Sequence, residues 1–204
     1  MTRLLLATHN RNKRKEISTL LRNFKSVKVM TLDDLDVEPP IIVEDGKTFR
    51  QNAVKKAVTM SRFFDGMVLA DDSGLAVDAL HGKPGVRSAR FARAKATDEE
   101  NNTKLLKLLD KFQPKDRKAE FVCNIALAQK GHLLGNYEGV VRGSILEEAR
   151  GDNGFGYDPL FVPDGHEKTF AEMAPSYKNR ISHRALALKE FKKAIVKLAG
   201  TLTA

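Results

Sequence analysis

The stretch AEFVCNIALAQKGHLLGNYEGVVRGSI, residues 119–145, decides the fold expected for this chain. Its two halves, 119–129 and 132–145, are long, and their apolar and β-branched residues are typical of strands. Lys130 and Gly131 stand between them, and such a short connection with a glycine favours a β-hairpin. Strands and helices alternate in the rest of the chain. A hairpin inserted into that alternation predicts an α/β fold around a mixed sheet.

Alternating strands and helices flank the hairpin, and no linker or repeat interrupts them. Two of the helices begin with a capping box, formed by Thr48 with Gln51 and by Thr97 with Glu100. The predicted elements are a strand at 3–7, a helix with apolar positions Ile17, Leu20, Leu21 and Phe24, a helix at 48–64, a strand at 67–70, a helix at 97–109, a short strand at 159–162 and a helix from about Ser182. We therefore expect residues 1–204 to form a single domain.

The composition narrows the class of protein. The chain has 204 residues, of which 42% are hydrophobic and 30% charged, and these values are ordinary for a folded domain. Cys123 is the only cysteine, which excludes an internal disulfide and favours a reducing compartment. No run has the length of a membrane span, and the N-terminus does not resemble a signal peptide. We expect a cytoplasmic protein without a membrane partner.

Cations gather at the starts of two predicted helices. The net charge of +9 favours an anionic partner, although basic helix faces exposed to water would give the same charge. Helix N-termini normally attract acidic side chains. The cations there are instead Arg11, Lys13, Arg14 and Lys15 in the first helix and His183 and Arg184 in the last, with Lys178 just upstream. One cationic helix start alone is weak evidence for an anion site, but two such starts in one chain indicate bound phosphate.

Carboxylates stand where α/β proteins often place chemistry. Asp71 and Asp72 follow the strand expected at 67–70 and precede a glycine turn. Because neighbours on a strand point to opposite sides, the partner of one aspartate at a metal ion is expected to be Glu44. Carboxylates without a cluster of histidine or cysteine favour Mg²⁺ or Mn²⁺. The alternative interpretation is a solvated acid pair in an Asx-turn.

Three further segments have a composition that bears on chemistry. RGDNGFGYDPLF, residues 150–161, has three glycines in six residues and suits neither a stable helix nor an ordinary strand. Asn52 and Lys56 lie one helical turn apart, so they either face one anion or form ordinary helix surface. The segment HGKP at 81–84 lacks the other residues that a P-loop requires, which excludes a GTPase or kinase of that type.

Five motifs occur in the order seen in the inosine triphosphate pyrophosphatase family, also called Ham1. They are ATHNRNKRKE, DGKTFRQNAVKKA, LADDSGLAVDALHGKPGVRSARFA, RGDNGFGYDPLFVPDG and KNRISHRALAL. The chain resembles that family from residue 4 to about 190. The resemblance implies an elongated mixed sheet with flanking helices, two lobes around a nucleotide cleft, and a homodimer. It also implies Mg²⁺-dependent hydrolysis of ITP, dITP and XTP to the nucleoside monophosphate and pyrophosphate.

The resemblance also implies roles for individual residues. Asp72 corresponds to the proton acceptor and, together with Glu44, to the metal ligands. The implied substrate-binding residues are Thr8, His9, Asn10, Arg11, Asn12 and Lys13 for the triphosphate, then Lys56 and Ser73, and Phe155, Gly156, Tyr157, Asp158, Lys178, His183 and Arg184 on the base side. The glycines let the backbone approach a flat ligand, Phe155 offers a stacking face, and Asp158 fixes the loop or the base.

Three other functions are left open by the sequence. A nucleic-acid-binding module would use the net charge of +9, but the acidic loop and the lack of interleaved surface aromatics argue against it. Maf-type nucleotide pyrophosphatases share the broad architecture but lack the FGYDP and SHR segments found here. A nucleotide sensor without catalysis is disfavoured by the intact set of acids. The expected partners are a purine nucleoside triphosphate and a second copy of the chain, with no nucleic acid.

Overall fold

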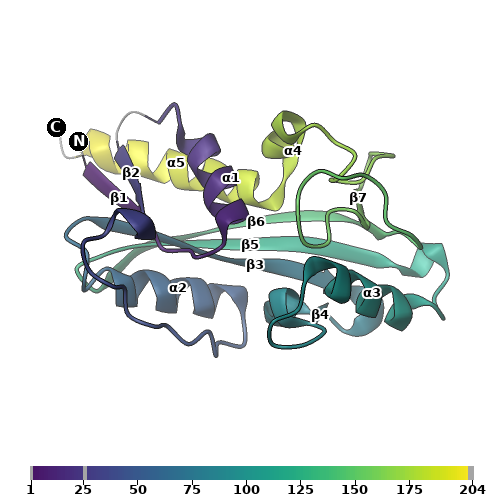
Figure 1. The fold of residues 1–204 in the computed structure, drawn as a ribbon. Coiled ribbons are helices and arrows are strands. Elements are labelled where there is room, and N and C mark those ends of the chain that lie inside the picture. Colours follow the sequence, from purple (N-terminus) through teal and green to yellow (C-terminus); the bar gives the residue numbers. More distant parts are fainter. Residues whose placement is uncertain (1, 25–26, 202–204) are drawn as a thin grey trace. The chain divides into compact units, whose positions relative to one another are not determined.

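The computed structural model describes residues 2–24 and 27–201, with side chains for 3–24 and 27–195 (Figure 1). The strands are β1 (Thr2–Leu6), β2 (Val27–Thr31), β3 (Met67–Val77), β4 (Lys83–Pro84), β5 (Lys118–Gln129), β6 (His132–Ile145) and β7 (Phe161–Pro163). The α-helices are α1 (Arg11–Leu21), α2 (Phe49–Met60), α3 (Asp98–Leu109), α4 (Pro175–Ile181) and α5 (His183–Thr201). None of the described helices is both long and apolar enough to span a membrane.

The strands form one sheet that contains both parallel and antiparallel pairs. Their order is β2-β1-β3-β5-β6-β7, and β4 pairs with β3. β1 is parallel to both of its neighbours, with Leu4 opposite Val29 in β2 and Met67 in β3. The pairs β3–β4 and β6–β7 are antiparallel. This arrangement confirms the predicted α/β fold with a mixed sheet.

The predicted hairpin connects β5 to β6 through Lys130 and Gly131. Their φ angles are 51° and 79°, and positive φ at both turn residues is typical of the type I′ turn that suits a twisted hairpin. The Gly131 N–H also donates to Ser61 Oγ at 2.9 Å, just beyond the end of α2. The turn is therefore fixed by its own backbone conformation and by a contact to a neighbouring helix.

The chain divides into two compact units. The first unit comprises Met1–Asp72, Cys123–Gly139 and Arg184–Ala204, and the second comprises Ser73–Val122 and Val140–His183. The strands β3, β5 and β6 each contribute residues to both units. The expectation that residues 1–204 form a single domain of two lobes stays a prediction.

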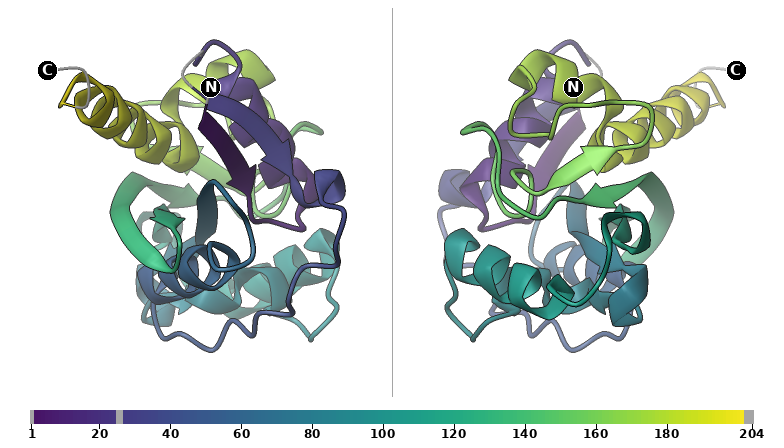
Figure 2. Two further views of the ribbon diagram at one scale, coloured as in Figure 1. Left: turned by 90° about the vertical axis from the view of Figure 1, so that its left-hand side faces the viewer. Right: turned by 90° about the vertical axis from the view of Figure 1, so that its right-hand side faces the viewer.

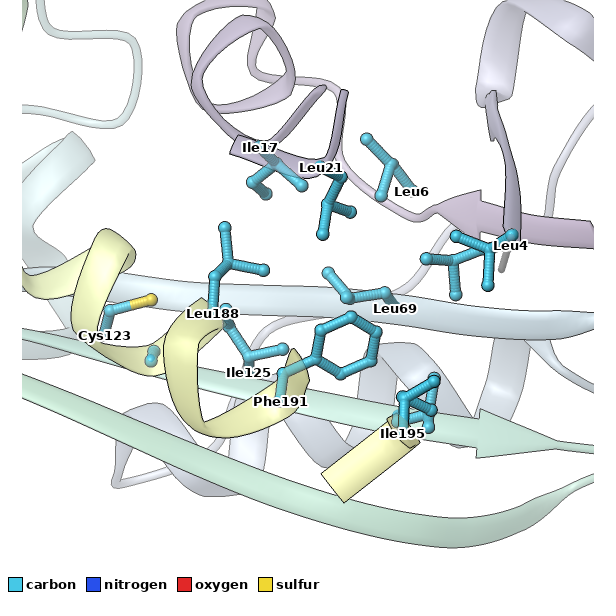
Figure 3. Close-up of a cluster of buried hydrophobic side chains, with 13 residues drawn as sticks. Leu4, Leu6, Ile17, Leu21, Leu69, Cys123, Ile125, Leu188, Phe191 and Ile195 are labelled. Atoms are coloured by element: carbon cyan, nitrogen blue, oxygen red, sulfur yellow. The ribbon is translucent and has the colours of Figure 1, made fainter. Parts of the chain in front are cut away.

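In the first unit, alternate residues of β1 pack on opposite faces of the strand. Leu4 and Leu6 join a core cluster with α1 and α5, whereas Leu5 joins a cluster with α2. Figures 1 and 2 show α1 and α5 on one side of these strands and α2 on the other. Figure 3 shows the first cluster, to which the two helices contribute Ile17, Leu21, Leu188, Phe191 and Ile195. Three helices that carry predicted site residues, α1, α2 and α5, thus pack on the same strands.

The second unit has a core of its own. Leu105 of α3 belongs to it, as does Tyr157 of the glycine-rich segment. The Phe121 ring of β5 lies 4.7 Å from that of Phe161 and 6.0 Å from that of Phe170, measured between ring centroids. This aromatic packing fixes the chain around Phe161 and Phe170 against β5.

Three elements of the structure, β2, β4 and α4, are not predicted by the sequence patterns. Among the described strands, β2 has five residues and pairs with β1 alone, and its side chains show no clear alternation of burial. β4 has two residues. α4 has seven residues and begins at Pro175, a residue that is favoured in the first turn of a helix. All three elements are too short to give a reliable periodic pattern, so tertiary contacts decide them.

Candidate active site

Asp71 and Asp72 lie inside β3, which continues to Val77. The sequence pattern predicts that the strand ends at residue 70, and this prediction is wrong. The alternative interpretation of a solvated acid pair is wrong as well, because residues Asp71 and Asp72 are only 1% and 6% exposed. Burial of such carboxylates is tolerated only when cationic or amide groups accompany them. Each aspartate has such partners here. The partners of Asp71 differ from those of Asp72, as expected because neighbouring side chains point to opposite faces of a strand.

Asp72 lies beside α2 and the loop that precedes it. The Asn52 amide donates to Asp72 Oδ2 at 3.0 Å, and its oxygen accepts from the Gly46 N–H at 2.7 Å. Lys56 Nζ lies 3.0 Å from Glu44 Oε2 and 4.0 Å from Asp72 Oδ1. The two carboxylates therefore converge on one ammonium group. Carboxylates that flank one cation in this way are suited to share a hard divalent ion.

The surroundings of Asp72 also favour its protonation. Burial raises the pKa of this carboxyl, and the nearby charges of Lys56 and Lys13 do not offset that effect. A carboxylate with a raised pKa accepts a proton more readily near neutral pH. Asp72 is therefore a candidate general base.

Asp71 contacts α1 and the start of α5 instead. Its Oδ2 lies 3.0 Å from Lys13 Nζ and 3.7 Å from Arg184 Nε, and Arg184 also pairs with Glu16. Burial alone would raise the pKa of Asp71, but the nearby cations, above all Lys13 and Arg184, hold the pKa well below its usual value. Asp71 is therefore an anion at neutral pH that holds two cationic side chains in place.

The start of α1 has the cationic character expected from the sequence, with no acidic residue in its first turn. Asn10 is the N-cap, and its side-chain oxygen accepts from the Lys13 N–H at 3.0 Å. Thr8 Oγ1 accepts from the Asn10 N–H at 3.3 Å. The other predicted residues of this turn, all exposed, are His9, Arg11 and Asn12. A helix N-terminus with this composition suits a bound phosphate.

The glycine-rich segment, 150–161, forms consecutive turns in the second unit. Asp158 holds it from inside, because it accepts from the Phe155 N–H at 2.9 Å and from Lys178 Nζ at 2.5 Å. A Cβ atom at Gly154 would lie 2.1 Å from Asp158 Oδ2, so this close approach requires glycine. Lys178 Nζ also lies 4.9 Å from the centre of the Phe155 ring. The structure thus brings together three residues predicted for the base side.

The remaining predicted residues of the second unit are Ser73, Gly156, Tyr157 and His183. The Tyr157 hydroxyl donates to the Ser88 carbonyl at 2.9 Å, and the His183 ring stacks on Phe121 with centroids 4.7 Å apart. Ser73 is partly buried in β3. The predicted site residues therefore form two groups, one within each unit.

The metal-binding capacity rests on the pair Glu44 and Asp72. Among residues 2–24 and 27–201, no three side chains of histidine, cysteine, aspartate or glutamate are grouped so that they could hold a metal ion. Mg²⁺ nevertheless needs only one or two protein carboxylates when substrate phosphates and water complete its coordination. The pair fits that requirement.

A comparison with models of protein families identifies the family of the chain. Residues 4–194 match the model of the Ham1 family. The chain belongs to the Ham1 family. This membership confirms the resemblance inferred from the five motifs.

Relatives within the Ham1 family are similar over nearly their full lengths. A protein of Caldanaerobacter subterraneus subsp. tengcongensis named dITP/XTP pyrophosphatase is 47% identical, and the match covers 97% of this chain and 98% of that protein. A dITP/XTP pyrophosphatase of Shouchella clausii is 45% identical, with 96% and 97% covered. The solved structure of a HAM1 protein from Coxiella burnetii is 40% identical, covers 97% of this chain and 100% of that one, and has a TM-score of 0.86.

The site of this Ham1 family chain also contains residues that the sequence patterns do not assign. Asn52 is fully buried and contacts Asp72, and its spacing of four residues from Lys56 is the one local signal of that role. Glu16 pairs with Arg184 across 168 positions of sequence. No local pattern reveals such a pair, because only the packing of α1 against α5 creates it.

Proposed function

We propose that this chain hydrolyses the deaminated purine nucleoside triphosphates ITP, dITP and XTP to the nucleoside monophosphate and pyrophosphate. The observation that carries the proposal is the convergence of Glu44 and Asp72 on Lys56, in the same unit as a cationic helix start. Relatives that are 41–47% identical and named dITP/XTP pyrophosphatases support the substrate class.

The start of α1 and two lysines are the proposed triphosphate site. The N–H groups that follow the N-cap Asn10 and the charges of Lys13 and Lys56 offset the phosphate charges. Asp71 holds Lys13 at 3.0 Å, so the ammonium is fixed before the substrate binds. Such preorganised groups stabilise charge in the transition state without further rearrangement.

Glu44 and Asp72 are the residues that would hold Mg²⁺ or Mn²⁺. When bound, the ion would neutralise charge on the phosphates and on the leaving pyrophosphate. Asn52 orients Asp72 through the amide contact of 3.0 Å. Asp72 accepts a proton from a water molecule, whose oxygen forms a bond to the α-phosphorus. The bond from the α-phosphorus to the bridging oxygen breaks, and pyrophosphate leaves.

The glycine-rich segment is the proposed base site. The Phe155 ring offers a stacking face, and Asp158 with Lys178 holds the backbone around it. His183 and Arg184 are the proposed donors toward a 6-keto oxygen, and Arg184 is held in place by Glu16 and Asp71. Adenine has a 6-amino group, which would set donor against donor and leave buried groups unpaired.

The proposal includes a homodimer in the cytoplasm, as the family resemblance implies, with neither nucleic acid nor membrane as a partner. Light scattering on the purified chain measures the oligomeric state directly. A mass equal to that of one chain, 22.7 kDa, would contradict the dimer.

A panel of nucleoside triphosphates tests the activity. Purified protein with Mg²⁺ is incubated with ITP, dITP, XTP, ATP and GTP, and pyrophosphate and orthophosphate are measured separately. We expect pyrophosphate and the monophosphate from the first three substrates, with ATP the poorer substrate. Orthophosphate as the primary product would contradict the proposal, because the γ-phosphorus would then be the one attacked.

A further inference from the structure

Two side chains of α3 bind one residue of the glycine-rich segment. Asp98 Oδ2 accepts from the Gly156 N–H at 2.6 Å, and Asn102 Nδ2 donates to the Gly156 carbonyl at 3.0 Å. Residues four apart lie on the same face of a helix. Both backbone groups of Gly156 are therefore bonded to a single face of α3.

Gly156 is the position at which the segment most needs such support. Its φ is 65°, and no atom lies within 4 Å of the place where a Cβ would stand, so side-chain packing does not fix it. A glycine with that freedom has many backbone conformations to lose. Its neighbours are held by other contacts, Phe155 by Asp158 and Tyr157 by Ser88. The two bonds to α3 hold the two peptide groups on either side of the Gly156 Cα.

α3 is a rigid support for these bonds. Its N-terminus is closed by a capping box between Thr97 and Glu100, and Leu105 is fully buried in the core of the second unit. Asn101 is buried as well and accepts from the Ala92 N–H at 2.8 Å. A helix fixed at its start and along its buried face cannot follow a moving loop.

We propose that Asp98 and Asn102 are positioning residues for recognition of the purine base. By fixing Gly156 they set the backbone that carries the Phe155 ring, so that the stacking face is ordered before the substrate arrives. Ordering in advance reduces the free energy lost on binding and acts mainly on affinity. This inference rests on the proposed function, because it assigns the segment to the base of the triphosphate.

Three variants at the start of α3 separate this role from a general effect on the helix. Asp98→Ala removes the acceptor of the Gly156 N–H. Asp98→Asn removes the charge but keeps an acceptor oxygen. The matched control, Glu99→Gln, removes the same charge from the same helical turn at an exposed position about 100° around the helix.

Steady-state kinetics with ITP and Mg²⁺ give the readout. For Asp98→Ala we expect KM to rise about tenfold, the effect of one lost hydrogen bond, with kcat close to that of the wild type. Asp98→Asn is expected to restore most of the affinity, and Glu99→Gln to behave like the wild type. A role in helix stability alone would make Asp98→Ala and Glu99→Gln alike, and that result would overturn the proposal.

Asn102→Ala provides an independent test, because alanine is the best helix former and the variant is expected to fold. We expect its KM to rise by a similar factor. If Asp98→Ala fails to fold, as judged by circular dichroism, an unchanged KM in Asn102→Ala overturns the proposal. Failure of the proposed function gives a result that is distinct from failure of the positioning role. In that case neither the wild type nor Glu99→Gln would release pyrophosphate from ITP, and both proposals would be wrong.

Discussion

Asp71 and Asp72 are neighbours in β3, yet their surroundings give them opposite properties. Burial raises the pKa of Asp72 above its usual value, since Lys56 and Lys13 only partly oppose it. Burial acts on Asp71 too, but Lys13 and Arg184 lie close enough to hold its pKa below the usual value. One residue is thereby suited to accept a proton, and the other to remain charged.

Asp72→Asn tests the assignment of the base. The substitution keeps the shape and removes the charge and the basicity, so we expect kcat for ITP to fall by roughly two to four orders of magnitude. The fold is expected to persist, because the replacement is isosteric, and thermal unfolding checks this. Activity near that of the wild type would show that another acid accepts the proton.

Asp71→Asn is expected to act on stability. It leaves the buried Arg184 and the partly buried Lys13 with less compensating charge, and a broken buried pair costs about 3–5 kcal/mol. Because the folded pKa of Asp71 lies below its usual 3.8, the unfolded chain takes up the proton first as the pH falls. The stability that Asp71 contributes is therefore present at neutral pH and is lost progressively below pH 3.8.

Urea unfolding at several pH values measures this effect. We expect the difference in unfolding free energy between wild type and Asp71→Asn to be largest at neutral pH and to shrink as the pH falls below 3.8. A difference that stays constant across this range would mean that the carboxylate charge of Asp71 does not stabilise the fold.

At the scale of elements, α2 connects the two proposed metal ligands. Its residue Asn52 accepts from Gly46, in the loop that carries Glu44, and donates to Asp72. One side chain thus holds both the loop and the strand. The capping box of Thr48 and Gln51 fixes the helix start from which Asn52 projects.

Asn52→Ala is expected to lower kcat about 10- to 100-fold, the usual effect of removing a partner that orients metal ligands. Gln51→Ala is the matched control, because it weakens the capping box one residue away but leaves the contact with Asp72 intact. Measuring kcat of both variants at saturating Mg²⁺ shows whether the loss comes from Asn52 or from the helix start. Equal losses in the two would assign the effect to the helix start and not to Asn52.

Elements specified by local chemistry are the ones that the sequence predicts. The capping boxes place the starts of α2 and α3 correctly, and the positive φ at Lys130 and Gly131 agrees with the predicted hairpin. The course of β3 through Asp71 and Asp72 is not predictable in this way. Burial of those carboxylates depends on Lys13, Lys56 and Arg184, which lie far away in the sequence and arrive only through packing.

At the scale of the whole molecule, the predicted roles are divided between the units. The first unit contains the cationic start of α1, the two carboxylates and Lys56, whereas the second contains the glycine-rich segment with Phe155, Asp158 and Lys178. The motifs predict both groups, because each motif is short and locally encoded. They do not predict the ion pairs of Arg184 or the contacts of α3, which join distant parts of each unit.

Hydrolysis of ITP in ¹⁸O-labelled water tests the central claim most directly. Attack of water on the α-phosphorus places the label in IMP, so mass spectrometry is expected to find one ¹⁸O atom in IMP and none in pyrophosphate. Label in pyrophosphate would mean attack on the β-phosphorus, and label in orthophosphate with IDP as the other product would mean attack on the γ-phosphorus. Either of these results would contradict the account.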